Sequence, residues 1–164
     1  AKTPGQWLEF HSKFIFQRQM EKKIKHIMAK SGLYHYELVE IDKLVKLGRQ
    51  FVDPRLTGET ILSCGSFFKE IIDNAHGVIS IGPFACLPTR IVEAIITPEA
   101  TVENKLRFCG DGDKFTYLHE LQRLPFLSIE ADGNPYPPIV EARIESFCVQ
   151  VNRVYQLCQA QKKD

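Results

Sequence analysis

Two short apolar segments, each followed by turn-forming residues and then by a helix pattern, most constrain what this chain can fold into. The first, VISIG at 78–82, leads through GPFACLP into the helical pattern TRIVEAII. The second, FLSIE at 126–130, leads through ADGNPYPP into a long terminal helix pattern that extends to Cys158. Short strands with apolar residues on both sides suit a parallel sheet that helices cover. The sequence therefore predicts an α/β fold, with a parallel sheet and flanking helices.

Two strands alone do not make a stable sheet, so the pattern requires more sheet than these two segments supply. Residues 97–124 are the least regular part of the chain, with FCGDGDKF typical of a loop and TYLHELQR typical of a brief helix. Two alternatives follow. Either this stretch adds a strand, or polypeptide outside the 164 residues completes the sheet.

The first part of the chain is predicted to be helical. Apolar residues at helical spacing, from Phe10 to Met28, predict a helix over 6–30 that ends at Gly32. Two further helices are expected, over 35–50 and 57–73.

These patterns suggest a domain organisation. We expect residues 1–50 to form a helical amino-terminal segment that packs on an α/β domain of residues 51–164. The two parts would make one folded unit. The opening AKTPGQW, without an initiator methionine, suggests a piece of a longer chain.

Composition and charge argue against several classes of protein. Hydrophobic residues make up 44% of the chain and charged residues 25%, with a net charge of +1, as in ordinary globular proteins. This balance gives no reason to expect nucleic-acid binding. The sequence also contains no apolar run of about 18 residues, so we expect neither a transmembrane helix nor a membrane partner. The odd number of widely spaced cysteines, without a secretory signal, predicts reduced thiols in a cytoplasmic protein.

A candidate site lies where the two predicted strands end. In open α/β sheets, ligands bind beyond the carboxyl ends of the parallel strands. GPFACLPTR follows the first strand and EADGNPYPP follows the second. We therefore expect one crevice to be lined by a candidate metal ligand, Cys86, and by candidate cofactor-binding residues, Thr89, Arg90, Glu130, Asp132 and Asn134.

Cys86 would carry the chemistry of this crevice. It lies at or just before a helix start, where backbone N–H groups and the helix dipole favour an anion. The same setting favours the thiolate, which is the form that binds metal or attacks an electrophile. The alternative is a buried cysteine that packs as a small apolar residue beside Phe84 and Leu87. Glu130 and Asp132 also have a plainer interpretation, as acidic and turn residues that end a strand.

The remaining cysteines give no second site. Cys64, Cys148 and Cys158 fall on apolar helix stripes and are expected in the core, whereas Cys109 is expected in a polar loop. The sequence has no cysteine or histidine spacing for zinc and no Ser-His-Asp, Walker or Rossmann motif. No catalytic residue is therefore expected.

Two segments carry a family resemblance. GVISIGPFACLPTRIVEAI, together with PFLSIEADGNPYPPIVEARIESF, resembles the carboxyl-terminal part of proteins related to the activators of 2-hydroxyacyl-CoA dehydratases. These are the large, multidomain CoA-enzyme activase polypeptides, and the resemblance covers roughly residues 50–157. It implies a fold that resembles a lobe of the dehydratase subunits.

The resemblance also implies a cofactor. In that family, ATPase modules of the acetate-kinase and Hsp70-like fold are fused to a dehydratase-like region, whose lobes hold an iron–sulfur cluster through cysteines from separate loops. Cys86 matches the cysteine of the GPFxCxP motif and would be one ligand, with Arg90 and the 130–134 loop around it. Because a cluster needs about three or four thiolates, the other ligands would come from outside this chain or from a second copy.

For function, the resemblance implies that this chain is a domain of an activase-related protein in an anaerobic cytoplasm. That protein would take part in ATP-driven, low-potential electron transfer. The domain alone is expected to be catalytically silent and without a cofactor, because it lacks the ATPase motifs. Its expected partners are the ATPase and dehydratase-like regions of its parent polypeptide, and a second copy in a homodimer. Two alternatives stay open: a non-redox docking or regulatory module that has lost the cluster, and a domain that binds CoA or phosphate at the helix start.

Overall fold

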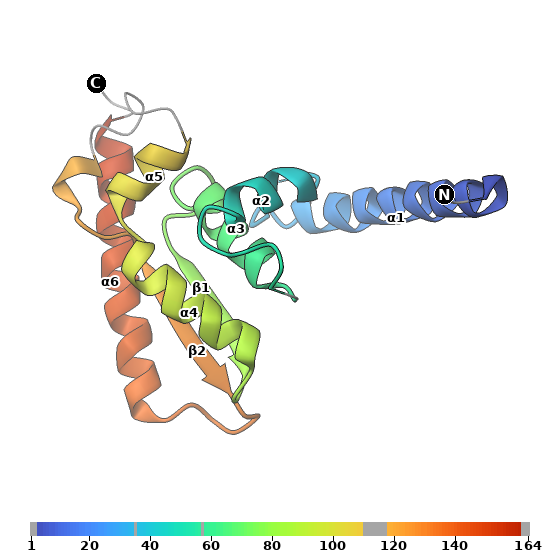
Figure 1. The fold of residues 1–164 in the computed structure, drawn as a ribbon. Coiled ribbons are helices and arrows are strands. Elements are labelled where there is room, and N and C mark those ends of the chain that lie inside the picture. Colours follow the sequence, from blue (N-terminus) through green and yellow to red (C-terminus); the bar gives the residue numbers. More distant parts are fainter. Residues whose placement is uncertain (1–2, 35, 57, 110–117, 162–164) are drawn as a thin grey trace. The chain divides into compact units, whose positions relative to one another are not determined.

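The computed structural model describes residues 3–34, 36–56, 58–109 and 118–161, and it divides into two compact units (Figure 1). The first unit comprises residues 1–40 and the second comprises residues 41–164. The division falls earlier than residue 50, because the helix that follows residue 40 packs on the next helix of the second unit. Of the helices in the described part of the chain, none combines the length and the apolar character that crossing a bilayer requires.

The first unit is built on helix α1, Pro4–Ala29. A capping box fixes its start: the Thr3 hydroxyl accepts from the Gln6 N–H, and the Gln6 side chain accepts from the Thr3 N–H. Gly32, with a φ of 71°, follows the end of the helix, as the sequence predicted. The first predicted helix is therefore confirmed.

Residues 36–40 run back along α1 and are not helical, although the sequence predicted a helix over 35–50. Glu21 holds this segment, because its carboxylate accepts the Val39 N–H at 2.8 Å and pairs with the Lys25 ammonium at 3.0 Å. The hydrogen bond from Val39, supported by Lys25 and Arg18, lowers the pKa of Glu21 from 4.5 to about 2. The ionised Glu21 carboxylate thus helps to join the two parts of this unit, together with hydrogen bonds from Lys25 to the Glu37 carbonyl and from Arg18 to the Val39 carbonyl.

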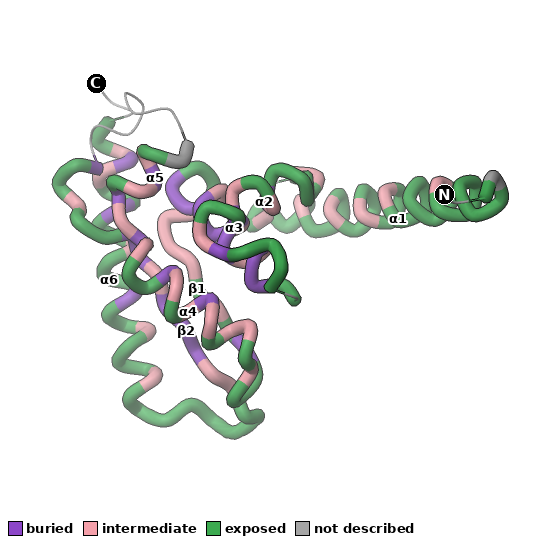
Figure 2. Tube along the Cα trace, viewed as in Figure 1, coloured by how far each residue is buried: buried purple, intermediate pink, exposed green. Residues whose placement is uncertain are grey.

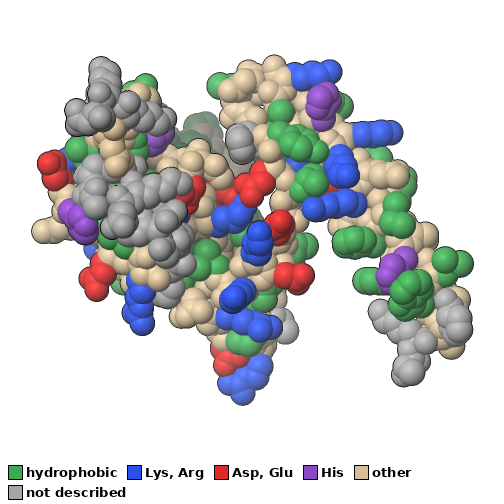
Figure 3. Space-filling model, turned by 90° about the horizontal axis from the view of Figure 1, so that it is seen from above, with side chains coloured by type: hydrophobic (Ala, Val, Ile, Leu, Met, Phe, Trp, Pro, Cys, Tyr) green, Lys and Arg blue, Asp and Glu red, His purple; other side chains and the backbone are tan. Residues whose placement is uncertain are grey.

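The apolar stripe predicted on α1 is not buried. Large hydrophobic side chains lie exposed along the helix, among its Lys and Arg side chains (Figure 3). The exposed residues are Trp7, Leu8, Phe10, Phe14, Ile15, Phe16, Met20, Ile24, Ile27 and Met28. The periodicity therefore predicted the helix correctly without predicting burial.

The second unit is a mixed α/β layer. Its elements are, in order, α2 (Ile41–Gly48), α3 (Thr60–Glu70), β1 (Val78–Pro83), α4 (Leu87–Glu99), α5 (Val102–Cys109), β2 (Phe126–Ala131) and α6 (Pro138–Gln161). The strands β1 and β2 pair in parallel, with Val78 opposite Phe126 and Pro83 opposite Ala131. Both predicted strands form, and the prediction of an α/β fold with a parallel sheet and flanking helices is confirmed.

The two faces of the sheet pack against different helices (Figure 2). Side chains alternate along a strand, so Phe126 joins the main core with α3 and α4, whereas Leu127 and Ile129 pack against α6. Along β2 the central residues are buried on both faces. On β1, the alternate residues Ile79 and Ile81 are exposed.

The helices α2 and α3 cross at two glycines. A Cβ on Gly48 would lie 2.0 Å from the Ile61 carbonyl oxygen, and a Cβ on Gly65 would lie 2.1 Å from the Leu44 carbonyl oxygen. Since backbone cannot move aside as a flexible side chain can, both positions require glycine. This close crossing attaches residues 41–48 to the α/β unit.

The irregular stretch 97–124 supplies no third strand within the residues that the structure describes. α4 continues through Pro98, α5 follows, and a single 3-10 turn lies at 118–120. The loop prediction was wrong for Phe108 and Cys109, which are the last two residues of α5. The rest of that predicted loop, and the start of the brief helix TYLHELQR, lie outside the described residues.

Lys105 of α5 is completely buried, which no pattern in the sequence predicted. Its ammonium donates to the Phe68 carbonyl in the last turn of α3, at 2.8 Å, and to the Asp73 carboxylate at 2.5 Å. Between these two partners, Ile72 takes a φ of 73°, a conformation rare for a β-branched residue. Lys105 therefore fixes α5 to the strained turn that ends α3.

Candidate functional site

The connection from β1 to α4 is a tight turn that ends at Cys86. The Cys86 N–H donates to the Pro83 carbonyl at 3.1 Å, and Ala85 takes a φ of 58°. Glycine usually occupies such a position, because a side chain in the left-handed region costs about 1 kcal/mol or more. Cys86 then occupies the N-cap position of α4, whose first residue is Leu87, two residues before the predicted helical pattern TRIVEAII begins.

The Cys86 side chain lies at the surface of this turn. It is partly exposed, is not in a disulfide, and makes no capping hydrogen bond to α4. Its neighbours Phe84 and Leu87 are 71% and 68% exposed. The alternative prediction, in which Cys86 is buried beside Phe84 and Leu87 as a small apolar residue, is therefore wrong.

Thr89 has a packing role that the sequence did not suggest. A Cβ on Gly82 would lie 2.3 Å from the Thr89 hydroxyl oxygen, so Thr89 rests directly on the backbone of β1. Gly82 is thus required where α4 crosses the end of the strand, and Thr89 helps to seat the helix there.

Arg90 joins α4 to the end of β2. Its guanidinium lies 2.8 Å from the Glu93 carboxylate and 3.7 Å from the Glu130 carboxylate. The expected proximity of Arg90 and Glu130 is therefore present. Pairs as exposed as these contribute about 0–1 kcal/mol each, but they also balance the positive charge that the crevice would otherwise offer to an anion.

Asp132 and Asn134 form a turn with each other. The Asp132 carboxylate accepts from the Asn134 backbone and from its side-chain amide, both at 3.0 Å, and Gly133 has a φ of 87°. The hydrogen bonds from Asn134 lower the pKa of Asp132. The two loops are connected through their backbones, because the Phe84 N–H donates to the Ala131 carbonyl at 3.0 Å. This arrangement fits the interpretation of Asp132 as a turn residue that follows a strand.

The described residues do not supply a complete metal site. No group of three or more histidine, cysteine, aspartate or glutamate side chains is close enough to hold a metal ion in the part of the chain that the structure describes. Cys86 is a single thiol, whereas an iron–sulfur cluster takes about three or four. An iron–sulfur cluster that used Cys86 as a ligand would need its other thiolates from outside the described residues.

The helix cysteines divide into two groups. Cys64 and Cys158 are buried as predicted, and burial raises the pKa of Cys64 to about 11. The prediction for Cys148 was wrong, since it is exposed on α6. Adjacent helix residues point about 100° apart, and Phe147 takes the buried position beside it.

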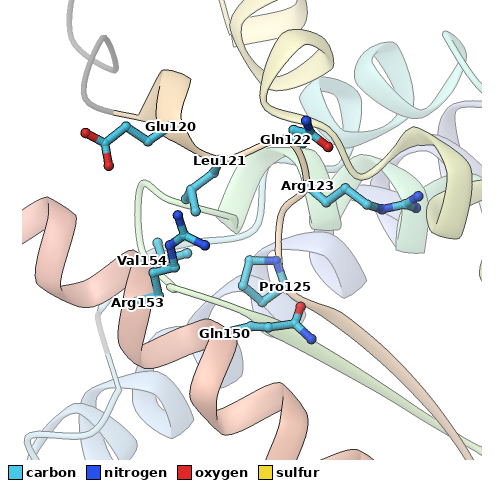
Figure 4. Close-up of a pocket in the computed structure, with 8 residues that line it drawn as sticks. All are labelled: Glu120, Leu121, Gln122, Arg123, Pro125, Gln150, Arg153 and Val154. Atoms are coloured by element: carbon cyan, nitrogen blue, oxygen red, sulfur yellow. The ribbon is translucent and has the colours of Figure 1, made fainter.

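Two pockets lie apart from the Cys86 turn. One, of about 410 Å³, lies near the amino end of β2 and is lined by Glu120, Leu121, Gln122, Arg123, Pro125, Gln150, Arg153 and Val154. In Figure 4, Arg123 points away from Arg153, which rises from α6 toward Leu121. The other pocket, of about 220 Å³, lies between α3 and β1. Sequence reasoning missed both pockets, because segments distant in sequence form their walls and no local pattern marks them.

No protein-family model matches the chain, and neither the curated proteins nor the solved structures include a match to it.

Proposed function

We propose that residues 41–164 are one component of an activase-related, multidomain protein, in which Cys86 supplies one thiolate to a composite iron–sulfur site. The parent protein would use ATP to drive low-potential electron transfer in an anaerobic cytoplasm. This domain would contribute one ligand and part of the surrounding wall, with a fold that resembles a lobe of the dehydratase subunits. The other ligands would belong to the rest of that protein.

The position of Cys86 carries this proposal. Its sulfur lies partly exposed at the start of α4, beside the carboxyl ends of the two parallel strands. A strained turn, with Ala85 at positive φ, holds it there. Strained backbone often accompanies a functional constraint, and an exposed thiol at a helix start is suited to ligate iron.

The first test is the reactivity of Cys86 in the folded chain. Iodoacetamide at neutral pH should alkylate Cys86 on the same timescale as the exposed Cys148. Cys64 should stay unmodified, because it is buried and its pKa is raised to about 11. Mass spectrometry of the digested protein separates the three sites, and an inert Cys86 would contradict a ligand role.

The second test concerns the metal itself. The polypeptide that naturally carries this chain should contain iron and sulfide when it is purified without oxygen. Cys86→Ser should remove most of both, whereas Cys148→Ser, a matched substitution at an exposed cysteine of α6, should remove neither. An unchanged iron content in Cys86→Ser would exclude the ligand role.

A second candidate function is a docking module without redox chemistry. It is favoured by the exposure of Phe84 and Leu87 beside Cys86, which gives the turn an apolar surface. Alkylation of Cys86 in a parent protein that holds no iron would support this candidate. The CoA or phosphate alternative has weaker support, because Arg90 already pairs with Glu93 and Glu130.

A further inference from the structure

In the part of the chain that the structure describes, the backbone groups on the outer edge of β1 are not paired with another strand. The N–H groups of Val78 and Phe84 donate toward β2, to the carbonyls of Pro125 and Ala131. Backbone groups in a parallel strand face alternate sides, so those of Ile79 and Ile81 face away from β2. Among the described residues, β1 pairs with β2 alone. Within these residues, the sheet therefore stops at β1, and no described strand pairs with the outward backbone groups of Ile79 and Ile81.

The outer edge of β2 is different, because α6 closes it. The same alternation directs the Ser128 carbonyl away from β1, and the Arg143 guanidinium of α6 donates to that carbonyl at 2.9 Å. Leu127, Ser128 and Ile129 are all less than a tenth exposed. A strand could not reach this edge without displacing Arg143, so the sheet can extend only beyond β1.

Both faces beside β1 also suit a further strand. On one face, Ile79 and Ile81 are 41% and 61% exposed, although isoleucines on a parallel strand are normally covered. On the other face, the pocket of about 220 Å³ has walls from α3, β1, α4 and β2. It is lined by Ser63, Ser66, Phe67, Glu70, Val78, Ile79, Ser80, Val92 and Phe126. α3 packs on this face, since its Phe67 ring contacts the Phe126 ring of β2, and Figure 1 shows α3 near β1, where it could also cover an added strand.

We infer that the outer edge of β1 is a docking site for a β-strand from another α/β domain, running parallel to β1. Backbone hydrogen bonds to Ile79 and Ile81 provide the attachment. On one face, the strand places a side chain in the pocket below α3. On the other face, the helix connected to that strand covers the two isoleucines. This inference does not depend on Cys86, so the two proposals can fail separately.

A second copy of this chain is a poorer occupant. Pairing two β1 edges about a twofold axis perpendicular to the sheet makes the strands antiparallel. It also brings two copies of α3 over the same pair of strands. No helix would then cover Ile79 and Ile81, because each α6 packs on its own β2.

The test uses a peptide with the sequence of residues 124–131, LPFLSIEA, which already pairs in parallel with β1 on its inner edge. In the chain alone, the amides of Ile79 and Ile81 should exchange with solvent rapidly, while those of Ser80 and Gly82 should be protected. Excess peptide should slow exchange at Ile79 and Ile81 by about tenfold or more, which corresponds to about 1.4 kcal/mol. The same peptide with alternate backbone nitrogens methylated should have no effect.

Two variants locate the effect on the protein. Ile81→Lys places a charge on the exposed face of β1 and should abolish the protection by the peptide. Val149→Lys changes a residue of α6 that is at least as exposed, and it should leave the protection unchanged. Both substitutions are at the surface, so both proteins should fold.

Three results would overturn the inference. The first is protection of Ile79 and Ile81 in the chain alone as a monomer, since the edge would then be covered already. The second is the same protection in a dimer seen by light scattering, which would identify a second copy as the occupant. The third is unchanged exchange at saturating peptide.

Discussion

The ion pair between the buried Lys105 and the partly exposed Asp73 predicts an asymmetry in stability. Lys105 is 0% exposed, whereas the Asp73 side chain is 34% exposed. Removing Asp73 leaves an ammonium that water cannot reach, while removing Lys105 leaves a carboxylate that water can. The two substitutions therefore break the same contact at different cost.

The magnitudes follow from that difference. Asp73→Ala should lower the free energy of unfolding by about 3–5 kcal/mol, because the buried Lys105 ammonium loses the carboxylate it pairs with, although it keeps the Phe68 carbonyl. Lys105→Met keeps most of the buried stem and removes the donor to the Phe68 carbonyl, so we expect a loss of about 1–3 kcal/mol. The double variant contains no buried charge and should be about as stable as Lys105→Met alone.

Urea unfolding followed by circular dichroism measures these differences. The informative comparison is Asp73→Ala against the double variant, in which a second substitution should restore about 2 kcal/mol. Lys69→Met is the matched control, since the Lys69–Glu70 pair is more exposed and should contribute about 0–1 kcal/mol. Additive losses in the double variant would refute the reasoning, because they would mean that Lys105 is not held by Asp73.

Three further predictions follow from the structure. Gly65→Ala should destabilise the second unit by about 2–4 kcal/mol, because the added Cβ meets the Leu44 carbonyl; a loss below 0.5 kcal/mol in urea unfolding would show that the helices can separate freely. Ser128→Ala should raise stability by about 1 kcal/mol, since the buried Ser128 hydroxyl has no hydrogen-bond partner among the described residues, and a marked loss would reveal a partner. Glu21 should hold Val39 fully above pH 4.5 and release it as the pH falls to about 2, because a lowered pKa adds stability that is lost on protonation. The chemical shift of the Val39 amide should follow that titration, and a midpoint near 4.5 or the same curve in Glu21→Gln would contradict it.

Local patterns predicted the elements around the sheet well. VISIG and FLSIE are strands, and the helical spacing from Val140 to Cys158 lies within α6. Each of these patterns is contained in neighbouring residues, which is why it can be recognised without the fold. The same patterns could not say which residues are covered. Cys148 and the stripe of α1 share their periodicity with core positions but are exposed.

The candidate site was predicted in part. The sequence placed Arg90 close to Glu130, because parallel strands end at the same edge of a sheet, and the two side chains do meet. It did not predict that Arg90 also pairs with Glu93, or that Asn134 donates two hydrogen bonds to the Asp132 carboxylate. These outcomes depend on side-chain reach and on competing partners, which spacing along the chain does not encode.

By itself, the sequence determined the two parallel strands, the helices that follow them and the cysteine between two prolines at the turn. Only the tertiary structure decided that Lys105 is buried and that Gly48 and Gly65 lie at a helix crossing. It also decided that Arg143 closes one edge of the sheet, while no strand among the described residues pairs with the other edge. The reason is physical. Periodicity and turn chemistry are properties of neighbouring residues, whereas burial and hydrogen-bond satisfaction depend on which distant segments come into contact.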